Sequence, residues 1–314
     1  MSRRTRVAVI GGGQNCEHEV SLASAAAAAA ALDPERYEVV ALTIGTDGSW
    51  RGDAGPVGLG AAVEELRTCD VVLPLLHGPR GEDGTLAALC ELAGVPYVGS
   101  GVRAGALAMD KWATKLVAEA HGIATATGVL LTAASARSYP WSGPVVVKPV
   151  AAGSSQGVAL VTEEAALVDA LTAALVLDDR VLVEEVVVGR EIDLAVLGTA
   201  EGERVVAPAL EIAVDGFFDF ASKYGGAAEF RIPAALSDAE AKELEDAAVT
   251  MYDALGCAGV ARIDFFLTPD GPVLNEVNTT PGFTEQSQVP KMFAAAGTSY
   301  ADLLTRLVED ALVT

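Results

Sequence analysis

The chain has 314 residues, about twice the ~150 residues typical of one domain, so two or three packed units are expected. With 51% hydrophobic and 20% charged residues, the composition excludes an intrinsically disordered or fibrous protein. A formal net charge of −22 argues against nucleic acid or anionic lipid as partners, and the lack of a long apolar run or a signal-peptide pattern predicts a cytoplasmic protein outside the membrane.

Residues 1–100 alternate short apolar runs with turns and helical patterns. The run 6–10 ends in Gly11–Gly13, and an Ala-rich helical segment then begins at Ser21 and stops before Pro34. Similar apolar runs follow at 37–44 and 71–75. This alternation predicts a doubly wound domain with a parallel sheet covered on both faces.

The pattern changes after residue 100. A helix from Asp110 to about His121 is followed by strand-like runs at 128–131, 144–150, 158–161 and 181–188. Tight turns join these strands, and a helix follows Thr162. Residues 101–188 are therefore expected to form a small α+β domain.

Residues 189–314 predict a second α+β domain. Its first strands are expected at 191–197 and 204–212, and the Gly-containing stretch 215–233 reads as a long loop of the kind that often forms a lid. Ser237 to Glu240 form a capping box that starts a helix ending at Gly256. Strands at 260–266 and 272–278 complete the domain.

The last two strands predict a hairpin with one polar face. A three-residue loop with Gly271 as a bulge would pair Thr268 with Pro272, so that Asp264 lies opposite Glu276 and Arg262 opposite Asn278. The other face would be apolar, with Ile263, Phe265, Leu267, Val273 and Val277. Side chains alternate along a strand, so this apolar face sets the register.

Two carboxylates directly opposite each other repel unless a proton or a cation lies between them. Asp264, Glu276 and the Asn278 carbonyl offer three oxygen ligands of the kind that Mg²⁺ accepts. The alternative is a solvated hairpin face. The four scattered cysteines and three histidines disfavour a zinc site, so any metal is expected to have oxygen ligands.

Two further segments suggest charged ligands. The Gly/Ser loop 153–157 follows Lys148, so its backbone N–H groups could wrap a phosphate, although such a loop is more often a plain turn. Gly11–Gly13 lacks the spacing of a dinucleotide fingerprint. Glu17 and Glu19 at a helix start would instead favour an ammonium group, with helix capping as the alternative.

Taken together, the motifs closely resemble the D-alanine:D-alanine ligase family of the ATP-grasp superfamily. They are EHEVS at 17–21, HGPRGEDG at 77–84, YVGSG at 97–101, MDK at 109–111, VKP at 147–149, GSSQG at 153–157, KY at 223–224, ARID at 261–264 and NEVNTTPG at 275–282. The ordered set covers nearly the whole chain. The resemblance implies an ATP-grasp fold in which domain 1–100 binds substrate and domains 101–188 and 189–314 clamp ATP.

The resemblance also implies a role for each site residue. ATP would be bound by Lys111, Lys148, Ser155, Glu184, Glu185, Val187, Glu191 and Lys223. Two Mg²⁺ ions, with Mn²⁺ as a substitute, would be held by Asp264, Glu276 and Asn278. The amino-acid substrates would be bound or activated by Glu17, His77, Ser154, Lys223, Tyr224, Arg262, Gly282, Ser287 and Gln288.

Within this set, Glu17 would take the ammonium of the first D-alanine, with Ser154 and Tyr224 hydrogen-bonded across the domains. Arg262 and the Gly282 N–H would stabilise the oxyanion. Lys223 and Ser287 would receive the second carboxylate, and His77 would lie near the second substrate.

The implied reaction is the ATP-dependent joining of two D-alanine molecules through an acyl phosphate, for peptidoglycan precursors. Two features depart from the family: Gln288 stands where leucine is usual, and the segment 224–233 is about one residue short. A ligase with D-serine, D-lactate or an unusual amino acid as second substrate therefore stays open, as does a non-catalytic nucleotide-binding protein. The apolar first domain suits a homodimer interface.

Overall fold

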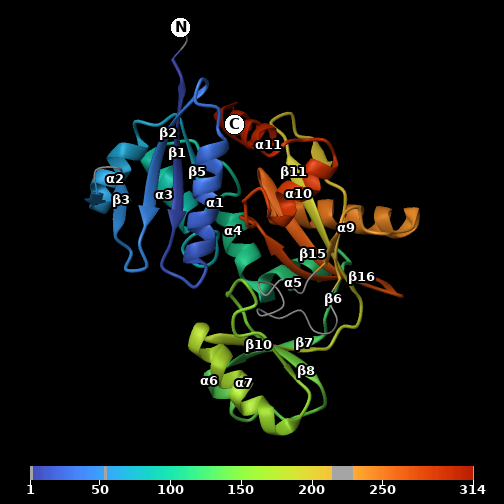
Figure 1. The fold of residues 1–314 in the computed structure, drawn as a ribbon. Helices are drawn as coiled ribbons and strands as arrows, with labels where there is room; N and C mark the ends of the chain where they lie inside the picture. Colours follow the sequence, from blue (N-terminus) through green and yellow to red (C-terminus); the bar gives the residue numbers. More distant parts are fainter. Residues whose placement is uncertain (1–2, 53–54, 214–228, 314) are drawn as a thin grey trace.

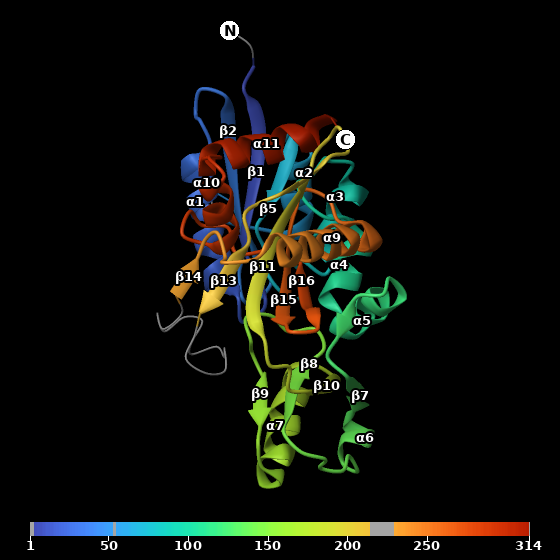
Figure 2. The ribbon, with the colours of Figure 1, turned by 90° about the vertical axis from the view of Figure 1, so that its right-hand side faces the viewer.

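The computed structural model describes residues 3–52, 55–213 and 229–313. Most of the predicted lid 215–233, including Lys223 and Tyr224, lies outside the described residues. Figure 1 shows three groups of elements: a sheet with helices at the N-terminal end, a sheet formed mainly by the C-terminal part of the chain, and a smaller unit beneath them. Turned by 90°, the smaller unit still projects from one end (Figure 2).

The first sheet has the strand order β4-β3-β2-β1-β5. Its parallel part, predicted from the alternation of strands and helices, consists of β1, β2 and β5, and the short strands β3 and β4 add an antiparallel edge. The strands are β1 (Thr5–Gly12), β2 (Tyr37–Ile44), β3 (Trp50–Gly52), β4 (Gly55–Val57) and β5 (Val71–Pro74). The helices are α1 (His18–Ala31), α2 (Leu59–Leu66) and α3 (Thr85–Ala93).

The smaller unit is a four-stranded antiparallel sheet in the order β7-β10-β8-β9. Its elements are β7 (Gly128–Thr132), α6 (Ala133–Ala136), β8 (Val145–Pro149), β9 (Ala159–Val161), α7 (Glu164–Leu177) and β10 (Arg180–Glu185). Leu167, Leu171 and Ala174 of α7 pack into the core of this unit. The Gly/Ser loop 153–157 joins β8 to β9, as predicted.

The third sheet runs β14-β13-β11-β15-β16-β6, with β12 also paired to β11. The single strand predicted at 204–212 was wrong: it is divided into β12 (Arg204–Val206) and β13 (Leu210–Ala213), which pair with different parts of β11 (Arg190–Gly198). Pro208 lies between them, and proline cannot donate a ladder hydrogen bond. The remaining strands are β6 (Ala124–Thr125), β14 (Glu229–Arg231), β15 (Val260–Thr268) and β16 (Gly271–Asn278).

Helices α4 (Val102–Met109) and α5 (Lys111–Ala120) pack beside this third sheet. They contact β16 and α9 (Asp238–Leu255), and β6 pairs in parallel with β16. The side chain of Asp110 caps α5 by accepting from the Ala113 N–H. The predicted capping box of α9 is present at Ser237, and Gly256 ends the helix in a left-handed conformation.

The β15–β16 hairpin confirms the two functional pairs but not the predicted turn. Thr268 pairs with Gly271, so the loop has two residues rather than three. The register then shifts between Phe265, which faces Leu274, and Asp264, which faces Glu276. The extra residue of this bulge restores the predicted pairing of Arg262 with Asn278. Leu274 instead of the predicted Val273 therefore lies in the core beside Phe265.

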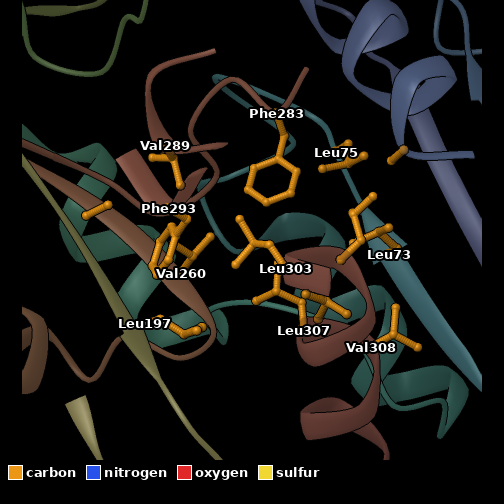
Figure 3. Packing of buried hydrophobic residues seen from close by; sticks show 14 of the residues in the cluster. Leu73, Leu75, Leu197, Val260, Phe283, Val289, Phe293, Leu303, Leu307 and Val308 are labelled. Atoms are coloured by element: carbon orange, nitrogen blue, oxygen red, sulfur yellow. The ribbon is translucent and has the colours of Figure 1, made fainter. Parts of the chain in front are cut away.

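A hydrophobic cluster joins the first and third sheets. Figure 3 shows Leu73 and Leu75 of the first unit facing Phe283, Leu303 and Leu307. The last two belong to α11 (Tyr300–Val313), which packs against α1, β5 and α10 (Gln288–Ala295). In the described part of the chain, no helix has the length and apolarity needed to cross a membrane.

Candidate active site

A cavity of about 760 Å³ lies between the small antiparallel sheet and the third sheet. Its lining includes every described residue that the resemblance assigned to ATP. These are Lys111, Lys148, Ser155, Glu184, Glu185, Val187 and Glu191. Arg262, Asp264 and Glu276 of the hairpin line the same cavity. The predicted nucleotide residues therefore share one space with two of the three predicted metal ligands, although several separate elements carry them. The third predicted ligand, Asn278, lines a much smaller pocket together with Lys111 and Glu276.

Lys148 is buried on β8 and pairs with Glu184 of β10, with 2.5 Å between Nζ and Oε2. The second oxygen of Glu184 lies 2.6 Å from Nζ of Lys115 on α5. Burial alone would raise the pKa of Glu184, but Lys148 and then Lys115 outweigh it and lower this pKa. Two ammonium groups therefore share one carboxylate, so this trio of side chains carries one net positive charge.

Lys111 at the start of α5 reaches across to the hairpin. Its Nζ lies 3.1 Å from Glu276 Oε2 and donates to the Ala152 carbonyl at 2.9 Å. Burial opposes the charge on this ammonium, but Glu276, then Glu82 and Glu17, outweigh burial and raise the pKa of Lys111. Lys111 is thus a charged group held at the junction of α5, β16 and the loop after β8.

Arg262 and Asp264 form a bidentate pair on the polar face of β15. Nε and Nη2 of Arg262 donate to the two oxygens of Asp264 at 2.7 and 2.6 Å. Asn278 on β16 donates to Asp264 Oδ2 at 3.0 Å. Burial opposes the charge of Arg262, but Asp264 and then Asp193 raise the pKa of its guanidinium. In this state, the two carboxylates of the predicted metal site are each paired with a cation.

The three proposed metal ligands supply only oxygen, from two carboxylates and an amide, and this donor type fits Mg²⁺. Among the described residues, no cluster of three or more His, Cys, Asp or Glu side chains could hold a metal alone. Mg²⁺ commonly combines one or two carboxylates with water and phosphate oxygens. The donor set therefore fits an ion that binds together with a nucleotide.

Glu17 ends the loop before α1 and is buried against the small unit. Ser154 donates from its hydroxyl to Glu17 Oε1, which links the first unit to the loop between β8 and β9. Glu17 Oε2 is buried without a hydrogen-bond partner among the described residues. A Cβ at Gly153 would come within 2.2 Å of this oxygen, so the close approach requires glycine. Such an oxygen is suited to accept from an ammonium group.

The Gly/Ser loop has an unusual backbone for its residue types. Ser154 and Ser155 have φ values of 52° and 55°, in the left-handed region that glycine favours. Residues held in this region cost free energy and cluster at ligand sites. The strained loop contacts Glu17 on one side and lines the cavity through Ser155 on the other.

His77 is buried between the first unit and the segment after β16. Its Nδ1 lies 2.7 Å from the Thr280 carbonyl, which can only accept, so Nδ1 carries the proton. Nε2 can then accept from Ser24 Oγ at 3.0 Å, and Ser24 in turn accepts from the Phe283 N–H. The imidazole therefore ties the first unit to the segment that carries Gly282.

Ser287 and Gln288 begin α10. Ser287 Oγ accepts from the Thr284 N–H at 3.0 Å, and Gly282 lies beside this turn. Gln288 is buried and lines the cavity, where its amide contacts Arg262 and Asp193. Lys223 and Tyr224, which the resemblance also assigned to the substrates, lie outside the described residues.

Sequence reasoning missed three charged residues of this site: Lys115, Asp193 and Glu82. Asp193 lies two residues after Glu191 in a strand, and this spacing already placed both on one face. Lys115 follows Lys111 by one helical turn. The place of Glu82 in the site is revealed only by its long-range contact, in which Glu82 Oε2 accepts from the Thr280 N–H. Burial, and then repulsion from Glu17, raises the pKa of Glu82 to about 8.

Comparison with protein families accounts for most of the chain. A family model described as D-ala D-ala ligase C-terminus matches residues 123–309. A second, described as D-ala D-ala ligase N-terminus, matches residues 6–60 and 51–100. The D-alanine–D-alanine ligase of Rhodococcus jostii (strain RHA1) is 42% identical over 357 residues, with 98% of this chain and 97% of the relative covered. That of Nocardia farcinica (strain IFM 10152) is 41% identical over 356 residues, with 99% and 98% covered.

Solved structures agree with these matches. VanG D-Ala:D-Ser ligase from Enterococcus faecalis superposes with a TM-score of 0.85 at 34% identity, covering 98% of this chain and 100% of that chain. The D-alanine–D-alanine ligase from Bacillus anthracis complexed with ATP gives a TM-score of 0.81 at 28% identity, covering 98% of this chain and 97% of that chain.

Proposed function

This chain belongs to the D-alanine–D-alanine ligase family of ATP-dependent ligases, and from that premise we propose that it joins two D-alanine molecules into D-alanyl-D-alanine, releasing ADP and phosphate. The dipeptide would serve peptidoglycan precursor synthesis. The observation that carries the proposal is the single cavity in which the ATP residues meet the hairpin residues Arg262, Asp264 and Glu276.

The first step activates a carboxylate. A carboxylate is a poor electrophile, so an oxygen of the first D-alanine takes the γ-phosphoryl group of ATP, and ADP leaves. Lys148 and Arg262 line the cavity as cations and would neutralise the oxygens that gain charge during this transfer. Glu17 Oε2, buried and without a hydrogen-bond partner among the described residues, would accept from the ammonium of this first substrate.

The second step forms the peptide bond. The neutral amine of the second D-alanine attacks the acyl carbon, and inorganic phosphate leaves as the tetrahedral oxyanion collapses. Arg262 and the Gly282 N–H would stabilise that oxyanion, and Ser287 with Lys223 would bind the second carboxylate. The acyl phosphate must be protected from water, and we assign that role to the segment 215–233, most of which lies outside the described residues.

Magnesium fits this scheme through Asp264, Glu276 and Asn278. Bound Mg²⁺ would supply positive charge to the phosphate oxygens, and two ions, replaceable by Mn²⁺, are proposed. Lys111 and Arg262 hold the two carboxylates in the state described here, so these cations would have to share them with the metal.

We also propose a cytoplasmic homodimer. All four cysteines are free, as expected in a reducing compartment that supplies ATP. Leu92 of α3 is 88% exposed and Leu59 of α2 is 53% exposed, and α2 contacts α3. These leucines give the first unit an apolar surface on which a second copy could pack. Sedimentation velocity would detect the resulting dimer.

The function is tested by the products formed from mixed acceptors. With Mg-ATP, D-alanine and D-lactate at about pH 7.5, mass spectrometry should find D-alanyl-D-alanine as the main product. The rate should rise between about pH 7 and pH 9, because more of the attacking amine is neutral there. L-alanine is the control acceptor. An absence of phosphate release with every D-amino acid would contradict the ligase assignment. A predominant D-alanyl-D-lactate product would contradict D-alanine as the preferred acceptor.

D-serine is the second candidate acceptor. It is favoured by the polar Gln288, which stands where the family usually has leucine, and by the 34% identity of this chain to VanG D-Ala:D-Ser ligase. The same assay with D-alanine and D-serine mixed in equal amounts measures this preference directly.

A further inference from the structure

Gln288 is the first residue of α10 and is 9% exposed. Its Oε1 accepts from Arg262 Nη1 at 2.6 Å, and its Nε2 donates to Asp193 Oδ2 at 2.8 Å. Both ends of the amide therefore contact charged, buried side chains. This assigns the oxygen and nitrogen of the amide without ambiguity, because a guanidinium only donates and a carboxylate only accepts.

Asp193 belongs to a row of three carboxylates across neighbouring strands. Asp193 on β11 lies opposite Asp264 on β15, which lies opposite Glu276 on β16. Like charges at directly opposite positions destabilise a sheet. Arg262 is the guanidinium nearest to this row, with Nε 2.7 Å from Asp264 Oδ1 and 3.6 Å from Asp193 Oδ2. Two carboxylates therefore compete for one guanidinium.

The contacts of Gln288 favour the pairing of Arg262 with Asp264 over its pairing with Asp193. Its amide gives Asp193 a hydrogen-bond donor, which leaves the bidentate geometry of Arg262 to Asp264. A guanidinium has five N–H donors. Among the described residues, Asp264 takes one from Nε and one from Nη2, and Gln288 takes one from Nη1, so within that part of the chain one N–H remains on each terminal nitrogen. This orientation sets where Arg262 can donate within the cavity.

We propose that Gln288, together with Asp193, is a positioning residue that fixes the Arg262 guanidinium for catalysis. The inference rests on the proposed function, since it assigns Arg262 to the reacting phosphoryl and acyl oxygens. It gives Gln288 a role different from recognition of a hydroxyl on the second substrate. The leucine usual in the family would leave Asp193 without this donor, so Gln288 and Asp193 act as a pair.

The pair can be tested by exchanging its amide and its carboxylate. Gln288→Glu alone places two carboxylates about 2.8 Å apart and should lower kcat by about tenfold or more, with KM for ATP changed by about twofold at most. Adding Asp193→Asn restores one amide, one carboxylate and the original charge. The double variant should return kcat to within about threefold of wild type. If the two sites were independent, the losses of activity from the two single substitutions would instead combine in the double variant.

Gln286→Glu is the matched control, because it adds the same charge two residues away at an exposed position. It should leave kcat within about twofold of wild type, as is usual for surface substitutions. Thermal unfolding is recorded for every variant, with kinetics measured well below each Tm. A loss of Tm with unchanged kcat in Gln288→Glu would show a merely structural role, and a double variant no faster than the slower single one would overturn the pairing.

Gln288→Leu separates positioning from substrate choice. The proposal expects a lower kcat with an unchanged ratio of D-serine to D-alanine incorporation, and a changed ratio at constant kcat would overturn it in favour of a specificity role. Wild-type turnover with D-alanine is measured first, so that its absence rejects the proposed function by itself. In that case the two single variants and the double variant at Gln288 and Asp193 are compared by their Tm values. If the Tm shift of the double variant equals the sum of the two single shifts, the Asp193–Gln288 contact is rejected.

Discussion

Three carboxylates of the cavity each form ion pairs with lysine or arginine side chains. Glu184 pairs with Lys148 and Lys115, Asp264 with Arg262, and Glu276 with Lys111. Removing one partner of a buried pair costs more than the pair contributes, because the other charge is left uncompensated. Single substitutions in this network are therefore expected to affect turnover strongly and stability measurably.

Glu276→Gln should reduce phosphate release by about 10²-fold or more while the far-UV circular dichroism stays unchanged, because one of the two metal carboxylates is lost. The measurement is phosphate release at saturating Mg-ATP. Glu245→Gln, at an exposed position on α9, is the control. Turnover close to wild type at high Mg²⁺ would reject the metal assignment.

Glu82 should make stability depend on pH. Burial raises its pKa from the ordinary 4.5 to about 8, so between these values the folded protein holds a proton that the unfolded chain has released. The free energy of unfolding should then fall as the pH rises, by up to about 1.4 kcal/mol per pH unit. Urea unfolding at several pH values between about 5 and 8 measures this slope.

Glu82→Gln should remove most of that slope, because the amide does not titrate. Glu35→Gln, at an exposed position, should leave the wild-type slope in place. Parallel stability profiles for wild type and Glu82→Gln would show that Glu82 is ionised throughout this range.

At the scale of elements, the loop between β8 and β9 depends on glycine where it meets another unit. Gly153 lies against Glu17, and Ser154 and Ser155 adopt left-handed backbone conformations. The loop thus connects the cavity, through Ser155, with the proposed site for the first amino acid.

Gly153→Ala should displace the Glu17 carboxylate, because the added Cβ would lie 2.2 Å from Oε2. We expect kcat/KM for the first D-alanine to fall by about 10- to 100-fold, as a misplacement near 1 Å can cause, with KM for ATP little changed. Gly60→Ala in α2 is the control, because its Cβ would meet nothing within 4 Å. Equal losses of kcat/KM for D-alanine and for ATP would mean that the substitution disturbs the whole loop and not only Glu17.

At the scale of the molecule, the first unit is attached to the third sheet by both apolar and polar contacts. The apolar part is the cluster around α11 in Figure 3, and the polar part is the contact of His77 with Ser24 and Thr280. Both hold Glu17 in place relative to the hairpin. The two sides of the proposed active site therefore depend on one interface.

Leu303→Ala should lower the free energy of unfolding by about 2–5 kcal/mol, because Leu303 is fully buried in that cluster. Leu312→Ala on the same helix, at a site 38% exposed, should cost about 0.5 kcal/mol or less. Denaturant unfolding compares the two. Equal effects would mean that α11 does not hold the units together.

Local patterns in the sequence determined much of this fold. The apolar run 37–44, the capping box at Ser237 and the alternation of strand and helix are short-range features, and each formed as expected. The pairing of Asp264 with Glu276 was also predicted, from the alternation of polar and apolar side chains counted back from the expected turn. The motifs identified the family, because their order along the chain is specific.

Only the tertiary structure decided which charges meet. The bulge in β16 is not visible in the sequence, because a two-residue turn with one extra residue gives the same functional pairs as a three-residue turn. Asp193 and Gln288 are 95 positions apart, and Glu82 and Thr280 are 198 apart. Contacts between such distant residues depend on how sheets and helices pack, and no local pattern encodes that packing. For this reason the sequence identified the reaction, while the arrangement around Arg262 emerged only from the fold.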